Sequence, residues 1–206
     1  LLGCLAMLVL HNLIRFAFSR SVSSLWLAAC EALLLISSAL FLNLLGPWFP
    51  LWHSAQPPGA YLALILTAPC GLMFTYTFFS SCKPSPLHEL LLLDILIISL
   101  GGLLLLFSDT LPLNLITYGL VGLASLSILL VATHHWQQGY RPARLFVVAM
   151  IIFNIGTLVI LPALLGLTLI APQELVLLLL AVVCVCGLLM SIALSERTRS
   201  IAEDQF

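Results

Sequence analysis

The sequence contains 206 residues, of which 62% are apolar and only 7% are charged, with a formal net charge of −1. A soluble domain carries about 25% charged residues, so this composition excludes a water-soluble globular domain and indicates a chain surrounded by lipid. The small net charge also gives no reason to expect a nucleic-acid partner.

The apolar residues fall into seven stretches, each close to the length of about 20 residues that an α-helix needs to cross a bilayer. The stretches are uninterrupted, and segments rich in proline or glycine, such as GPWFP and CKPSP, separate them. The sequence therefore predicts an all-α integral membrane protein, a seven-transmembrane-helix bundle. The predicted spans are 1–18, 22–45, 59–79, 87–107, 111–133, 143–167 and 173–194, and a cytoplasmic linker helix starts within 195–206.

The basic residues all lie beside odd-numbered connections between spans or after the last span. Because consecutive spans alternate in direction, these residues share one side of the membrane, and lysine and arginine are enriched on the cytoplasmic side. We therefore expect the N-terminus outside and the C-terminus in the cytoplasm. The seven residues are Arg15, Arg20, Lys83, Arg141, Arg144, Arg197 and Arg199.

Ionisable side chains are costly inside a bilayer, which makes those within the predicted spans candidates for function. Glu31 lies near the middle of the second span, and His11 lies at a similar depth in the first. We expect His11 to lie near Glu31, and Asp94 to reach Arg144 or Arg15. This polar cluster either fixes helix packing or changes its pairing between two signalling states. Its predicted members are His11, Asn12, Arg15, Glu31, Asp94, Arg141 and Arg144.

Chemical motifs are missing from the sequence. It has no phosphate-binding loop, no serine nucleophile elbow and no zinc-protease motif, so we expect no catalytic residue, cofactor or metal within this segment. The adjacent histidines His134 and His135 have no neighbouring cysteine or acid to complete a metal site. A retinal protein is excluded, because the span 173–194 contains no lysine for a Schiff base.

Two segments at predicted membrane boundaries carry motifs: GYRPAR at 139–144 and SIALSER at 191–197. They resemble the start of helix six and the end of helix seven in the bacterial seven-transmembrane receptors with diverse intracellular signalling modules (7TMR-DISM). The matching residues are Gly139, Arg141, Pro142, Ala143, Arg144, Ser191, Ala193, Leu194 and Arg197. In its first helix the family often has Tyr-Asn-Leu, whereas here His11 precedes Asn12 and Leu13.

The resemblance implies a homodimeric receptor of the bacterial inner membrane. A periplasmic sensor domain would precede the first helix, and a cytoplasmic output domain, either a histidine kinase (sometimes hybrid) or a diguanylate cyclase, would follow the seventh. The chain begins without an initiator methionine, and we expect a fragment that starts within helix one and stops in the output linker. The expected linker residues are Leu194, Arg197 and Ile201.

These features favour a signal-transduction domain that relays an extracytoplasmic signal to a cytoplasmic output domain, with the lipid bilayer as its surroundings. A small-solute membrane transporter is the alternative, although the sequence shows no clear inverted repeat. A membrane-embedded enzyme would need several convergent acids or histidines, and only His11 with Glu31 offers a start.

Overall fold

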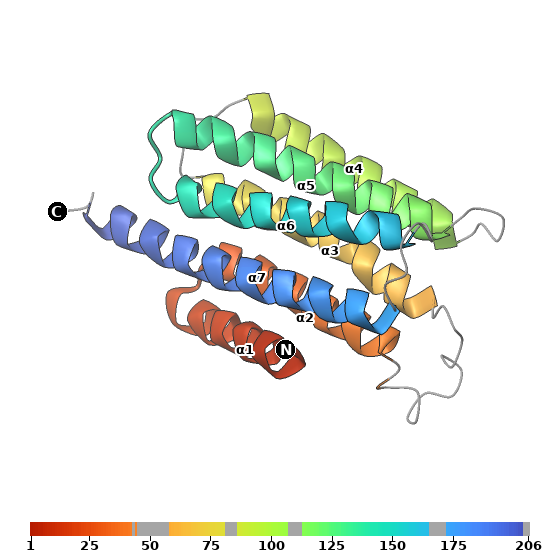
Figure 1. Cartoon of the computed structure of the whole chain (residues 1–206). Helices are drawn as coiled ribbons and strands as arrows, with labels where there is room; N and C mark the ends of the chain where they lie inside the picture. The colour runs from red at the N-terminus through yellow and green to blue at the C-terminus, as the bar shows by residue number, and fades with distance from the viewer. Residues whose placement is uncertain (43, 45–57, 81–85, 107–112, 165–171, 204–206) are drawn as a thin grey trace.

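Seven α-helices make up the regular structure that the computed structural model describes, which covers residues 1–42, 44, 58–80, 86–106, 113–164 and 172–203. This confirms the predicted all-α, seven-helix fold (Figure 1). The helices are α1 (Leu2–Ser19), α2 (Val22–Phe41), α3 (Pro58–Phe79), α4 (Pro86–Leu106), α5 (Leu113–Gln137), α6 (Ala143–Leu164) and α7 (Pro172–Glu203).

Within the described residues, six helices, α1 to α5 and α7, are long and apolar enough to cross a membrane. The apolar part of α6 whose side chains the structure describes is Ala143–Val159. Large apolar side chains also point outward: Met7, Leu96, Leu130 and Leu158 have between 64% and 66% of their surface exposed. An apolar outer surface of this kind is suited to lipid.

The helices are arranged so that α7 lies between the α1–α2 pair and α6, and α4 lies at the far edge. Helix α7 contacts α1, α2 and α6, whereas α4 contacts α3 and α5 (Figure 1). The turn from α1 to α2, the turn from α5 to α6 and the C-terminal end of α7 lie at the same end of the bundle. We call this the basic end, because Arg15, Arg20, Arg141, Arg144, Arg197 and Arg199 lie on the helix ends and turns that meet there.

Two connections at the basic end are short. Only Arg20 and Ser21 separate α1 from α2, and Arg20 adopts a left-handed conformation (φ 50°) in which its N–H donates to the carbonyl of Phe16. Between α5 and α6 the turn contains Gly139 with a φ of +90°, a conformation that favours glycine. Helix α5 ends at Gln137, four residues beyond the predicted span 111–133, before this turn begins.

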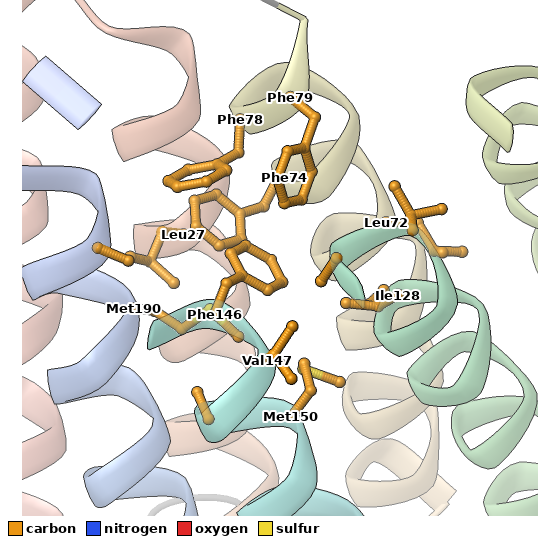
Figure 2. Packing of buried hydrophobic residues seen from close by; sticks show 14 of the residues in the cluster. Leu27, Leu72, Phe74, Phe78, Phe79, Ile128, Phe146, Val147, Met150 and Met190 are labelled. Carbon is orange, nitrogen blue, oxygen red and sulfur yellow. The ribbon is translucent and has the colours of Figure 1, made fainter. Parts of the chain in front are cut away.

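Aromatic side chains dominate the core near the basic end. Phe74 stacks on Phe146 with ring centroids 5.5 Å apart, and Phe78 contacts the same ring at 5.1 Å (Figure 2). Phe79 stacks on the buried ring of His135 at 4.6 Å. These contacts pack α3 against α5 and α6 near the basic end.

Candidate functional site

A buried hydrogen-bonded group joins α1, α2 and α7 in the interior of the bundle. Asn12 Nδ2 donates to Glu31 Oε2 at 2.9 Å and to Ser191 Oγ at 3.1 Å. These three residues are only 0%, 2% and 6% exposed, respectively. Because a primary amide has two N–H groups, Asn12 uses both to connect one residue on each neighbouring helix.

Arg15 lies three residues after Asn12 on the same face of α1, and its guanidinium donates to four acceptors on α7. Nη1 donates to the Ser191 carbonyl at 3.1 Å and to Ser195 Oγ at 2.6 Å. Nη2 donates to the Leu194 carbonyl at 2.7 Å and to Thr198 Oγ1 at 2.9 Å. Because these four acceptors follow one another along α7, they fix the position of α7 along the axis of α1.

Three further contacts hold the same part of α7 from other sides. Arg197 donates to Ser23 Oγ on α2 at 2.8 Å, and its guanidinium lies over the Phe78 ring of α3 at 5.5 Å. Arg144 on α6 forms an ion pair with Glu196 at 3.4 Å. The Arg144 side chain is 58% exposed, so this ion pair contributes little to stability.

The residues Ser191–Thr198 of α7 therefore contact polar or aromatic groups of α1, α2, α3 and α6, and we call them the anchor segment. Beyond it, α7 continues as a helix to Glu203. Such an arrangement is suited to conveying a movement of the membrane helices into the end of α7.

The anchor segment lies at the C-terminal end of a match to a known family. The model of the family described as 7TM diverse intracellular signalling matches residues 1–197 of this sequence. The chain belongs to this family. The match confirms the resemblance inferred from the sequence, and it makes the chain a multi-pass membrane domain of a signalling family. No curated protein and no solved structure matches the chain.

The structure corrects the predicted pairing of His11 with Glu31 in this signalling domain. The His11 side chain is exposed, and Asn12 occupies the position facing Glu31. The prediction identified the right depth on α1 but the wrong side chain. Successive residues of an α-helix point about 100° apart, so His11 faces outward while the next residue, Asn12, faces Glu31.

The predicted pairing of Asp94 is corrected as well. Asp94 is half-buried on α4, and among the described residues no hydrogen bond or ion pair joins it to Arg144 or Arg15. The reason is the helix order, since α4 contacts α3 and α5 at the far edge of the bundle. Arg15 binds α7 instead, and Arg144 binds Glu196.

The remaining predicted residues lie along the basic end. Arg141 is exposed in the turn before α6. Leu194 is buried, at 1% exposure, and its carbonyl accepts from Arg15. Arg197 is in the anchor segment, and Ile201 lies in the last turns of α7. Its side chain is outside the described part of the structure.

Several partners in the site were absent from the predicted cluster, namely Ser23, Phe78, Ser191, Ser195, Glu196 and Thr198. One signal for them was available, because Ser191, Ser195 and Thr198 recur at spacings of four and three residues and so share a helix face. As for metal binding, the described ranges contain no group of three His, Cys, Asp or Glu residues that could hold an ion.

Proposed function

We propose that this domain relays an extracytoplasmic signal to a cytoplasmic output domain attached after α7. The receptor would be a homodimer in the cytoplasmic membrane of a bacterium, with a sensor domain preceding α1 and a histidine kinase or diguanylate cyclase following α7. Membership of the signalling family supports the relay role. The positive-inside rule supports placing the basic end in the cytoplasm.

The observation on which the proposal depends is the direct connection between the first and last helices. Arg15 on α1 donates four hydrogen bonds to the anchor segment, and Asn12 adds a fifth to Ser191. A signal that moves α1 along its axis must therefore either shift α7 or exchange these bonds for others.

The relay works as a shift between two arrangements. In the arrangement described here, Arg15 binds the Ser191 and Leu194 carbonyls. In a second arrangement α7 is displaced along α1, and the guanidinium binds other acceptors on α7. Each arrangement presents the end of α7 to the output domain at a different height or rotation, and the signal changes their populations.

The test is to replace Arg15 by Ala in the full-length receptor and to measure the basal activity of its output domain, as autophosphorylation or cyclic dinucleotide synthesis. We expect a change of about 5-fold or more, in the range of ordinary coupling between sites. The matched control is Arg141→Ala, which removes an exposed arginine at the same end of the bundle and should leave the output unchanged.

Two outcomes would reject the relay proposal. One is a folded, membrane-inserted Arg15→Ala receptor with normal basal output and a normal response to its signal. The other is an equal change in output from the Arg141 variant, because this would indicate a general effect of charge at the membrane surface rather than of the α1–α7 connection.

A further inference from the structure

A cavity of about 140 Å³ lies among α2, α3, α5, α6 and α7 in the interior of the bundle. Its wall is almost wholly apolar, and Figure 2 shows several of the lining side chains converging from different helices. They include Leu27, Phe74, Ile128, Phe146, Met150 and Met190. An apolar cavity of about 150 Å³ is large enough to bind benzene, so this one has room for a body of about six or seven carbon atoms.

Most polar groups of the wall are occupied by the protein itself. The threonine and serine hydroxyls donate to backbone carbonyls of their own helices at 2.6 to 2.9 Å. They belong to Thr67, Thr75, Ser125 and Thr157. The thiols of Cys30 and Cys186 likewise point to carbonyls of neighbouring helices, at 3.7 Å and 3.2 Å.

Glu31 also lines the cavity, but its carboxylate is enclosed at one end of it. Oε2 accepts from Asn12 at 2.9 Å. A Cβ atom added to Gly187 would lie 3.0 Å from Oε1 and 3.1 Å from a methyl group of Leu8. Because α7 and Leu8 pack this closely at Oε1, a molecule in the cavity meets hydrocarbon rather than the carboxylate.

The cavity is therefore unsuited to water. A buried water molecule needs two to four polar partners, and among the described lining residues the hydroxyl of the half-buried Tyr118 is the polar group that remains. An empty cavity of this size also deprives its wall of contacts. An apolar occupant restores these contacts, whereas a charged one would be buried without a partner.

We propose that this cavity binds a neutral aromatic hydrocarbon of the size of benzene or toluene, which enters from the surrounding lipid. The rings of Phe74 and Phe146 in the wall suit an aromatic occupant, because aromatic rings attract one another in edge-to-face and offset arrangements. Met150 and Met190 add sulfur atoms, which also make favourable contacts with aromatic rings.

The cavity adjoins α7 directly before the anchor segment. Gly187 and Met190 line it, and the next residue of α7 is Ser191, where the anchor segment begins. An occupant would therefore bias the relay, a consequence that rests on the function proposed above. Binding itself does not depend on the relay. The experiment measures binding on the chain without an output domain, so a negative result rejects the site and leaves the relay proposal standing.

The four methionines of the chain provide reporters of binding. Met150 and Met190 line the cavity, whereas Met7 is 66% exposed on the outer surface. The purified chain carries ¹³C-labelled methionine methyl groups in lipid nanodiscs, Met→Leu variants assign the signals, and toluene is added stepwise. We expect the ring current of toluene to shift the Met150 and Met190 signals until they saturate. Met7 meets toluene only in the lipid, so its signal should change without saturating.

A second probe tests the apolar character of the site. Benzylamine is toluene with an added ammonium group, and it is compared at equal concentrations in the nanodisc. We expect the Met150 and Met190 signals to need about tenfold or more benzylamine than toluene for half-saturation, because the wall offers the ammonium group no partner. This comparison uses the unmodified chain, so it remains informative whatever substitutions do to folding.

A variant then locates the site. Ala124 lines the cavity at 2% exposure, and Ala124→Leu fills part of it. We expect this change to abolish the saturable response to toluene. Ala6→Leu is the matched control, because it adds the same atoms at an exposed position of α1; the response should be unchanged. Circular dichroism checks that both variants fold.

The proposal is overturned by any of four results on folded protein. The first is that Met150 and Met190 respond to toluene as Met7 does. The second is that benzylamine saturates the two signals at the same concentration as toluene. The third is that Ala124→Leu and Ala6→Leu respond alike. The fourth is that the two methyl groups show nuclear Overhauser effects to lipid acyl chains that toluene does not displace, which would make a lipid chain the occupant.

Discussion

At the scale of single residues, the amide side chain of Asn12 is important because it lies in the interior of the membrane domain. Asn12 connects Glu31 to Ser191, and without it the carboxylate would lose the only hydrogen bond that the described residues give it. A leucine at this position would fill a similar volume but donate nothing. The cost of the substitution is therefore the cost of an unpartnered buried acid, added to two lost interhelical bonds.

We expect Asn12→Leu to lower the free energy of unfolding by about 1–3 kcal/mol, the usual cost of leaving a buried polar group unsatisfied. The neighbouring substitution His11→Leu is the matched control, because it exchanges one exposed side chain for an apolar one on the lipid-facing side. It should be neutral. Unfolding in mixed micelles with increasing denaturing detergent measures both. Equal losses would mean that the rotation of α1 is wrong.

At the scale of elements, the position of α7 depends on its close approach to α6. A Cβ atom on Gly156 would lie 2.8 Å from one methyl group of Val182 and 2.9 Å from the other. Helices in membranes associate in part through close packing of this kind. Helices α6 and α7 therefore approach each other closely at Gly156 and Val182, in the half of the bundle away from the anchor segment.

Gly156→Ala should push α6 and α7 apart and destabilise the domain by about 1–3 kcal/mol, the range for overpacking. Gly119→Ala is the control, because nothing lies within 4 Å of its added Cβ on α5; alanine there should be neutral or slightly stabilising. Adding Val182→Ala to the Gly156 variant should restore stability. A double variant no more stable than Gly156→Ala alone would contradict the contact.

The seven helices were predictable from the sequence because apolar runs and proline-rich breaks depend only on local composition. Glu31 and Arg15 were also found, since charge is rare inside a membrane. The rotation of α1, which decides between His11 and Asn12, was not predictable. In lipid the outer face is as apolar as the core, so periodicity says little about which face is inward. The distance of Asp94 from Arg144 follows from helix order, which no local pattern specifies.

At the scale of the whole molecule, the described arginines at the basic end give the bundle a polarity across the membrane. Four helices, α1, α2, α3 and α6, contact the anchor segment of α7 there, while many large apolar side chains are exposed on the outer surface of the spans. The orientation proposed above follows from this asymmetry, and it determines which side of the membrane receives the end of α7.

Single cysteines introduced at Ser19, Arg199 and Leu44, all exposed positions, test this orientation in a cysteine-free background. We expect a membrane-impermeant maleimide to label Leu44→Cys in intact cells, and to label Ser19→Cys and Arg199→Cys only after the membrane is opened. Labelling of Ser19→Cys and Arg199→Cys from opposite sides would contradict the seven-span topology. Labelling of both from outside would reverse the orientation.

The two-residue connection between α1 and α2 has a mechanical consequence. With only Arg20 and Ser21 between them, and with many contacts between them, the two helices form a hairpin, and we expect them to move together. A pull on α1 from the outside would also draw α2 with it. Helix α7 would then receive the displacement from two directions, through Arg15 and through the bond between Ser23 and Arg197, which favours sliding over tilting.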